Sequence, residues 1–326
     1  MIEMDDALLV IKDLTIEYHT EDAVIHAVNN INLSVKRGET IGLVGETGAG
    51  KTTIARAIMR LLQSPPAKFC GGRIEFQGQD LMGLPEKQMR EIRGNKIAMI
   101  FQDPMTALNP VQRVGQQIAE AIMLHNNVRR AEAELMACDM LETVGIPSSR
   151  YKEFPDQFSG GMKQRVIIAI ALACNPLLLL ADEPTTALDV TIQAQVLRLM
   201  KTLKEKLGTS VVMITHDLGV VAGSCNSVAV IYAGEVVEYG SAENIFDFPE
   251  HPYTIGLFNS LPLLDTTERR LKPIKGLMPD PTIVPKGCRF NERCPDAEEK
   301  CSVHTPVDTE VTPGHIVKCL LRGGSE

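Results

Sequence analysis

The chain has 326 residues, 44% of them hydrophobic and 23% charged, which is typical of a globular protein with about two domains. A formal net charge of −8 gives no support to nucleic acid as the main partner. The acidic segment 1–6 is unlike a secretory signal, and the longest apolar stretch, residues 166–173, is too short to span a membrane. Any association with a membrane is therefore expected to come through a partner.

The N-terminal part of the chain is predicted to be an antiparallel β region. Short apolar segments predict strands at residues 8–16, 27–28 and 31–35. They lead into an apolar strand at 41–44 and, after a glycine-rich turn, into a helix over 53–62, where apolar residues recur at helical spacing. Further strands are expected at 73–78 and 97–101.

The glycine-rich turn has the residues of a phosphate-binding loop. Its glycines permit a tight turn in which backbone N–H groups close around phosphate oxygens, and the following helix N-terminus adds partial positive charge. Lys51 would reach the β- and γ-phosphates of a nucleotide, and the Thr52 hydroxyl would bind Mg²⁺. A turn that binds nothing is the alternative, which the flanking strand and helix disfavour. The predicted nucleotide-binding segment consists of Gly45, Glu46, Thr47, Gly48, Ala49, Gly50, Lys51, Thr52 and Thr53.

A helical insert is predicted from about residue 103 to about residue 175, because apolar residues recur at three- and four-residue steps from 114 to 144. Beyond it a helix is expected over 191–207. Four apolar strands are predicted at α/β spacing, at residues 177–181, 211–215, 228–232 and 235–238. This alternation predicts an α/β fold with a largely parallel core sheet.

Two carboxylates follow the leucine-rich strand at 177–181. Asp182 would lie at the carboxyl edge of a parallel sheet, where it can bind the Mg²⁺ that bridges the β- and γ-phosphates. Glu183, in a strand-like backbone, would face the other way and polarise a water molecule aimed at the γ-phosphorus. A solvated Asp-Glu pair at a turn is the alternative, and the upstream phosphate loop disfavours it.

A serine and two glycines, Ser159, Gly160 and Gly161, open a strongly helical stretch at residues 162–173. Ser159 is well placed to cap that helix. The same geometry makes an anion site from exposed N–H groups and a hydroxyl. A capped helix and a phosphate contact therefore both remain possible from the residues alone.

The composition changes beyond about residue 240, where proline becomes frequent and periodicity is poor. We therefore predict a domain at 1–240 and a loop-rich appendage at 241–326. The appendage contains four of the eight cysteines, and in a reducing compartment metal binding competes well with disulfides there. The other four are interpreted mostly as small buried hydrophobes: Cys70, Cys138, Cys174 and Cys225.

The phosphate loop, the Ser-Gly-Gly turn and the strand that ends in Asp-Glu occur in the order found in the ATP-binding cassette (ABC) family, which the chain resembles over nearly its full length. The resemblance implies a nucleotide-binding domain with a RecA-like parallel core, an antiparallel β region and a helical subdomain. It also implies Mg²⁺-dependent hydrolysis of ATP. In this family the Ser-Gly-Gly turn completes the ATP site of the opposite subunit, so two subunits close head-to-tail on two ATP molecules.

Four further positions match residues with roles in the family. Gln102 matches the glutamine that senses Mg²⁺ and the attacking water, and His216 matches the switch histidine that contacts the γ-phosphate. Asp189 matches the aspartate that communicates between subunits, and Tyr18 matches the aromatic residue that stacks on adenine. Since no expected catalytic position is degenerate, the resemblance implies an active hydrolase.

Residues 101–110, 181–195 and 251–254 resemble more closely the ATPases of oligopeptide and dipeptide importers. This implies a peripheral subunit on the cytoplasmic face of the membrane, paired as a heterodimer with a second, homologous ATPase beneath two permeases. An extracytoplasmic binding protein delivers the peptide. Nickel and glutathione importers have near-identical ATPases, so the cargo stays open. Non-transport ABC proteins usually carry two cassettes or a long coiled-coil insertion, and this chain has neither.

The cysteines of the appendage have the spacing Cys-x5-Cys-x6-Cys-x17-Cys, which lacks the close pairs usual in structural zinc sites. Four thiolates suffice for a [4Fe–4S] cluster, where irregular spacing is common, and some peptide-importer ATPases carry one at the matching cysteines. Zn²⁺ and unliganded thiols are the alternatives. The predicted ligands are Cys288, Cys294, Cys301 and Cys319.

Overall fold

The computed structural model describes residues 7–186, 188–260 and 273–322. The chain forms two compact units. The first unit comprises residues 1–35, 41–82 and 215–326, and the second comprises residues 36–40 and 83–214. The acidic segment 1–6 noted in the sequence lies outside the described residues.

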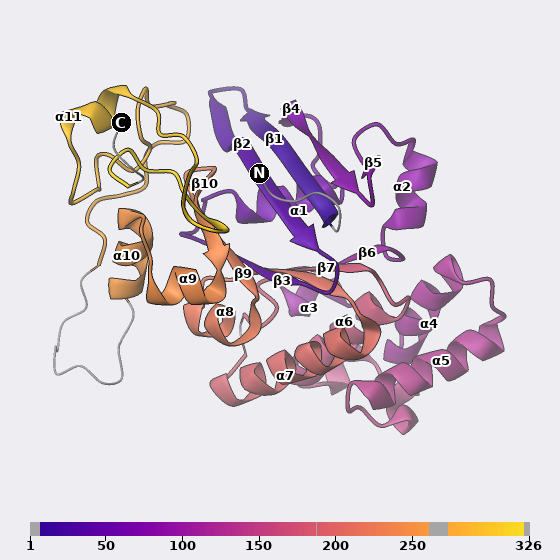
Figure 1. Cartoon of the computed structure of the whole chain (residues 1–326). Helices are drawn as coiled ribbons and strands as arrows, with labels where there is room; N and C mark the ends of the chain where they lie inside the picture. The colour runs from indigo at the N-terminus through magenta and orange to yellow at the C-terminus, as the bar shows by residue number, and fades with distance from the viewer. Residues whose placement is uncertain (1–6, 187, 261–272, 323–326) are drawn as a thin grey trace. The chain divides into compact units, whose positions relative to one another are not determined.

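The first unit contains the antiparallel sheet predicted for the N-terminal region (Figure 1). Its strand order is β2-β1-β4-β5. The strands are β1 (Ala7–His19), β2 (Val24–Lys36), β4 (Ala67–Phe76) and β5 (Gln79–Asp80). In the pairing of β1 with β4, Ile11 lies opposite Ile74, and both side chains are buried. Apolar residues on one face of the strands thus hold this sheet to the rest of the unit.

A second set of strands in this unit is mixed. Strand β3 (Thr40–Val44) runs parallel to β9 (Ser227–Tyr232), as predicted. Strand β10 (Glu235–Ser241) runs antiparallel to β9, so the predicted, largely parallel arrangement does not extend to this strand. The reason is the connection: only Ala233 and Gly234, both with positive φ, separate the two strands, and a parallel crossover needs a dozen or more residues.

The C-terminal segment extends these strands and their hydrophobic core. Strand β12 (His315–Val317) pairs with β10, and β11 (Thr309–Thr312) pairs with β12. The segment also contributes buried Tyr253 and Phe290 to a core that includes Tyr232 of β9. The helices of the unit are α1 (Lys51–Ile58), α8 (Leu218–Ser224), α9 (Ala242–Asp247), α10 (Pro252–Asn259) and α11 (Glu299–Val303).

The second unit has a parallel arrangement of β6 (Ile97–Ile100), β7 (Leu178–Asp182) and β8 (Ser210–Ile214). Every residue of these three strands is buried, as expected for parallel strands covered on both faces. The helices are α2 (Glu86–Ile92), α3 (Pro104–Ala107), α4 (Val114–His125), α5 (Arg130–Thr143), α6 (Gly160–Leu172) and α7 (Val190–Leu207), with 3₁₀ turns at Ser148–Lys152 and Pro155–Gln157. Within the described residues, no helix has the length and apolarity needed to cross a bilayer.

Candidate functional site

The glycine-rich turn after β3 has the closed backbone that a phosphate-binding loop needs. Gly45 and Gly50 have φ values of 149° and 104°. A Cβ atom would lie 2.1 Å from the Ile231 carbonyl oxygen at Gly45 and 2.5 Å from the Ala27 carbonyl oxygen at Gly50. Only glycine fits both positions, so the shape of the loop is fixed by contact with neighbouring strands.

Lys51 begins α1, and its side chain turns back over this loop. Its ammonium Nζ donates to the carbonyl oxygens of Gly45 at 2.7 Å and Glu46 at 2.9 Å, and the residue is buried. The N-cap of α1 is Gly50, which offers no side-chain acceptor to the first N–H groups of the helix. The N-terminus of a helix carries partial positive charge, so the start of α1 favours an anion.

Tyr18 and His216 are placed in the same unit as the loop. The Tyr18 hydroxyl lies 3.2 Å from the Thr53 hydroxyl in the first turn of α1. His216 is exposed and lies between two fixed neighbours. Asp217 caps α8 through bonds from the N–H groups of Gly219 and Val220, and its own N–H donates to Thr215 Oγ1. The backbone around the histidine is therefore held in place.

The second unit brings together Gln102, Glu183 and Thr186. Gln102 Nε2 donates to Glu183 Oε2 at 3.0 Å, and Thr186 Oγ1 donates to the same oxygen at 2.9 Å. Asp182, the last residue of β7, is buried next to them. The strand-like backbone predicted for Glu183 is wrong, because its φ is 47° and the chain turns there, directly after β7. Such a conformation is uncommon for a non-glycine residue and concentrates at functional sites.

Two capped helices present the remaining predicted residues of this unit. Ser159 caps α6, since its side chain accepts from the Met162 N–H at 3.4 Å, as the sequence predicts. Asp189 caps α7 in the same way, since its Oδ1 accepts from the Ile192 N–H at 2.9 Å. A Cβ atom on Gly161 would lie 2.4 Å from Ile192 Cγ2, so the second glycine allows the two helices to approach closely.

The predicted residues therefore fall into two groups, one on each unit. The first unit holds the phosphate loop, Tyr18 and His216. The second unit holds the remaining residues, namely Gln102, Ser159, Gly160, Gly161, Asp182, Glu183 and Asp189.

Two contacts to the phosphate loop were missed by sequence reasoning. Arg293 forms a two-fold ion pair with the Glu46 carboxylate, with N–O distances of 2.7 and 2.9 Å. The hydroxyl of Tyr253 accepts the Glu46 N–H at 3.0 Å. Tyr253 lies in the segment 251–254 noted above, but nothing in its spacing relates it to residue 46. Both contacts join residues more than two hundred positions apart.

His251 fixes the helix that carries Tyr253. Its Nδ1 accepts the Tyr253 N–H at 3.0 Å and so caps α10. Burial lowers the pKa of His251 from 6.5 to about 3, with a smaller contribution from the positive charge of Arg322. The imidazole is therefore neutral at physiological pH and can act as an acceptor.

This burial predicts a pH dependence of local stability around α10. The pKa of His251 is about 3 in the folded chain and 6.5 for an exposed histidine, so the unfolded form binds more protons between these values. The stabilisation is present above pH 6.5 and is lost as the pH falls towards 3. We expect the opening free energy of α10, measured by hydrogen exchange, to fall by about 1.4 kcal/mol between pH 7.5 and 5.5.

His251→Asn is the matched variant for this measurement, because asparagine caps helices but does not titrate. The opening free energy of α10 in this variant should change little over the same pH range. An equal loss in both proteins would show that other groups cause the pH dependence.

The four cysteines of the C-terminal segment lie in one neighbourhood of the first unit. Burial raises the pKa of Cys288, Cys294 and Cys319, to about 11 for Cys294, and neighbouring thiols add to each rise. Cys301 and Cys319 are the nearby thiols that affect Cys288, and the Cys288 N–H donates to the Cys301 carbonyl at 2.8 Å. All eight cysteines lie within the described residues, and none of them forms a disulfide.

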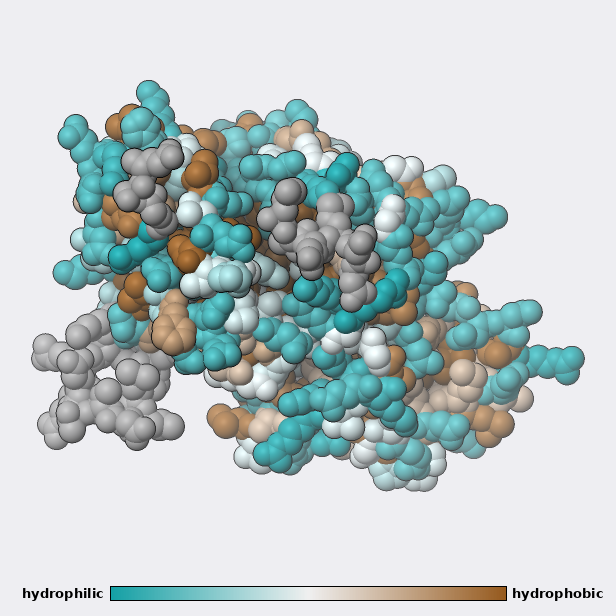
Figure 2. All heavy atoms as spheres, viewed as in Figure 1, coloured by the Kyte–Doolittle hydropathy of each residue, from teal (hydrophilic) through white to brown (hydrophobic). Residues whose placement is uncertain are grey.

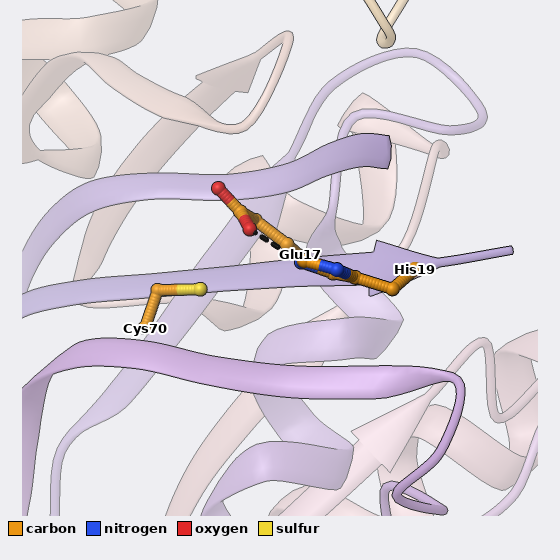
Figure 3. Close-up of side chains that lie close together, drawn as sticks. All are labelled: Glu17, His19 and Cys70. Atoms are coloured by element: carbon orange, nitrogen blue, oxygen red, sulfur yellow. Dashed lines mark hydrogen bonds and ion pairs between the residues drawn. The ribbon is translucent and has the colours of Figure 1, made fainter. Parts of the chain in front are cut away.

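A separate group on β1 and β4 consists of Glu17, His19 and Cys70 (Figure 3). Glu17 Oε2 lies 2.7 Å from His19 Nε2, and Oε1 lies 3.2 Å from His26 Nδ1. The His19 hydrogen bond lowers the pKa of Glu17 most strongly. Burial and the Glu17 carboxylate raise the pKa of Cys70. We interpret this group as a hydrogen-bonded surface cluster.

Comparison with known proteins finds relatives over nearly the full length of the chain. The family described as "ABC transporter" matches residues 28–186, and "Oligopeptide/dipeptide transporter, C-terminal region" matches residues 237–301. The oligopeptide transport ATP-binding protein OppD of Escherichia coli is 49% identical, over 97% of this chain and 93% of OppD. The probable peptide ABC transporter ATP-binding protein y4tR of Sinorhizobium fredii is 51% identical, over 96% of this chain and 95% of y4tR.

The fold is also similar to that of solved ATP-binding cassettes. The ATP-binding cassette MJ0796, solved as a dimer bound to ADP and Pi, has a TM-score of 0.65 and 29% sequence identity. It covers 72% of this chain and 98% of its own. The predicted fold class is thereby confirmed, and ATP hydrolysis is the activity of this fold. The chain belongs to the ATP-binding proteins of the ABC transporter family, in the branch that carries the oligopeptide/dipeptide transporter C-terminal region.

Proposed function

We propose that this protein hydrolyses ATP to drive the import of dipeptides or oligopeptides through membrane permeases. The observation that carries the proposal is similarity over nearly the full length to peptide transport ATP-binding proteins, at 49–51% identity. The match includes the C-terminal region at 237–301, which lies outside the nucleotide-binding segment. The predicted boundary near residue 240 between the two domains stays part of this proposal.

The roles of the residues follow from their chemistry. Lys51 and the N–H groups at the start of α1 would hold the phosphates of ATP, with Thr52 and Asp182 as ligands of Mg²⁺. Mg²⁺ would neutralise charge that develops on the phosphates. Glu183 would accept a proton from the attacking water, since a carboxylate is a suitable base at neutral pH. Its hydrogen bonds from Gln102 and Thr186, both to Oε2, hold the carboxylate in a defined orientation.

A second, homologous ATPase subunit is the proposed partner on the nucleotide side. Ser159, Gly160 and Asp189 are exposed, so they are accessible to a molecule outside this chain. The capping bonds order these residues at two adjacent helix N-termini, which favour negative charge. The exposed turn would thus meet the γ-phosphate of ATP held by the other subunit, in a head-to-tail heterodimer.

A permease is the proposed partner of the helical part of the second unit. Apolar side chains are exposed on α4 and α5, at Met123, Leu124, Leu135 and Met136. Figure 2 shows hydrophobic residues gathered over these helices, whereas hydrophilic residues cover much of the visible face. Apolar residues grouped in this way suit contact with another protein. Binding to two permeases would place the protein at the cytoplasmic face of the membrane, with an extracytoplasmic binding protein acting indirectly.

Uptake of labelled substrates by the native cell tests the cargo. Cells that carry Glu183→Gln should lose uptake of a labelled dipeptide or a labelled pentapeptide and keep uptake of labelled nickel and glutathione. Loss of nickel or glutathione uptake alone would retain the ATPase and replace the cargo. No change for any of the four would contradict the transport proposal and return attention to a non-transport role.

We further propose that the four C-terminal cysteines hold a [4Fe–4S] cluster. Four thiols in one largely buried neighbourhood are the donor set that such a cluster takes. The irregular spacing of these cysteines in the sequence, without the close pairs usual in structural zinc sites, supports the iron–sulfur group over Zn²⁺.

Metal analysis tests this cluster. Anaerobically purified protein should contain about four iron and four sulfide per chain. Cys294→Ser should lower the iron content strongly, because it removes one of the four ligands. Cys70→Ser, which removes an exposed thiol of β4, should leave the iron content unchanged. Colourless protein with stoichiometric zinc would contradict the iron–sulfur proposal.

A further inference from the structure

A two-fold ion pair joins the phosphate loop to the cysteine-bearing segment. Arg293 Nη1 lies 2.7 Å from Glu46 Oε2, and Nη2 lies 2.9 Å from Oε1. The Arg293 side chain is 6% exposed, and that of Glu46 is 30% exposed. Two parallel N–H···O bonds fix both the distance and the orientation of a carboxylate, so the acidic side chain has a defined direction.

Arg293 is itself held rigidly. Its Nε donates to the Lys275 carbonyl at 3.1 Å, and Nη1 also donates to the Tyr232 hydroxyl at 3.3 Å. Its guanidinium carbon lies 5.6 Å from the centre of the Tyr232 ring, within the range of a cation–π interaction. Since these contacts come from β9 and from the C-terminal segment, the arginine is a fixed part of the folded unit.

The backbone of the loop is held from the same place. The buried Tyr253 hydroxyl accepts the Glu46 N–H at 3.0 Å. The Tyr253 ring lies 4.6 Å from that of Tyr232 and 5.4 Å from that of Phe290, centre to centre. Phe290 lies between Cys288 and Cys294 in the sequence. One aromatic cluster therefore supports both the side chain and the backbone of Glu46.

The charge of Glu46 makes this support relevant to nucleotide binding. A carboxylate in a loop that binds the phosphates of ATP repels them, and the repulsion is stronger where water is partly excluded. Arg293 neutralises this charge and holds the Glu46 carboxylate towards the C-terminal segment. The loop also has a Met278 methyl group 3.4 Å from the position of a Cβ atom on Gly48. The C-terminal segment thus lines one side of the loop.

We infer that Arg293 is a positioning residue for the phosphate loop, which makes the affinity for ATP depend on the folded C-terminal segment. The inference rests on the proposed role of the loop in binding ATP. The C-terminal segment thereby acts on the nucleotide site of its own chain. Arg293 offsets the charge of Glu46 and keeps the loop in its binding conformation.

The test is the dissociation constant of a fluorescent ATP analogue, measured with Mg²⁺ on the full chain. Arg293→Met should weaken binding of the analogue about tenfold, which is a typical change in affinity when one site of a protein is coupled to another. Arg289→Met is the matched control, because Arg289 belongs to the same segment and lies 2.8 Å from Glu235, with a side chain that is 10% exposed. This control should stay within about twofold of the wild type. Equal affinity in wild type and Arg293→Met would overturn the inference.

The double variant Glu46→Gln/Arg293→Met separates charge compensation from simple loss of structure. It lacks both charges, so it should recover most of the affinity lost in Arg293→Met. A double variant as weak as the single one would contradict the electrostatic role. Arg293→Lys, which keeps the charge but not the two-fold geometry, should bind with intermediate affinity and serves where Arg293→Met does not fold.

Lys51→Ala distinguishes failure of this inference from failure of the proposed function. If Lys51→Ala binds the analogue as tightly as the wild type, the proposed role of the loop fails. If Lys51→Ala loses binding but Arg293→Met does not, the loop binds nucleotide and only the role of Arg293 is wrong.

Discussion

Replacing Glu183 with glutamine is expected to lower ATP turnover by the assembled transporter at least about a hundredfold while ATP still binds. Glutamine cannot accept the proton of the attacking water. It can still accept hydrogen bonds from Gln102 and Thr186, which now bond to the Glu183 carboxylate. The local structure should therefore persist, including the left-handed backbone at residue 183. Phosphate release gives the turnover, and retention of radiolabelled ATP gives the binding.

The control is Glu205→Gln, the same chemical change at an exposed position near the C-terminal end of α7. Its turnover should match the wild type. If Glu183→Gln also turned over ATP at the wild-type rate, Glu183 would not be the general base. A variant that neither binds nor hydrolyses ATP would instead assign Glu183 to binding. The assembled complex is required, because each site is proposed to need the partner subunit.

Replacing Lys51 with alanine is expected to weaken ATP binding about a hundredfold, since it removes charge-assisted hydrogen bonds to the phosphates worth roughly 3 kcal/mol together. Before ATP binds, the Lys51 ammonium donates to the carbonyls of Gly45 and Glu46. Both acceptors belong to the loop, so the lysine is already directed to where phosphate is proposed to bind. The measurement is the dissociation constant of the fluorescent ATP analogue on the isolated chain.

Lys206→Ala, which removes an exposed lysine of α7, is the control and should bind the analogue normally. Because Lys51 is buried, the thermal midpoint of each variant without nucleotide should be recorded as well. A Lys51→Ala chain that is folded and binds with wild-type affinity would contradict the proposed phosphate contact.

The sequence predicted most local elements because their signals are local. The apolar periods of β7, β8 and α7 and the glycines of the phosphate loop all act within a few residues. Errors arose where geometry depends on a connection or a turn. Strand β10 is antiparallel because only two residues connect it to β9. Helix α1 ends at Ile58 instead of residue 62, and Arg60 then has a left-handed φ of 49°.

The candidate site shows the same division between local and distant interactions. Residue types and spacing predict roles for Lys51, Asp182 and Glu183, because each lies at or after the end of an apolar strand. They could not give the φ of 47° at Glu183, which the backbone adopts directly after the strand. Nor was the capping role of Asp189 predicted, because this residue was interpreted only as the aspartate that communicates between subunits.

The order of residues was sufficient to predict the family and the fold, because each motif is short and chemically complete; the residues of the nucleotide site stay a prediction. The link between the C-terminal segment and the phosphate loop could not be predicted in this way. Arg293 and Glu46 are 247 positions apart, and they meet because β9, α10 and the cysteine-bearing segment share one aromatic core. Such a contact is specified by packing among distant segments, and no local pattern records it.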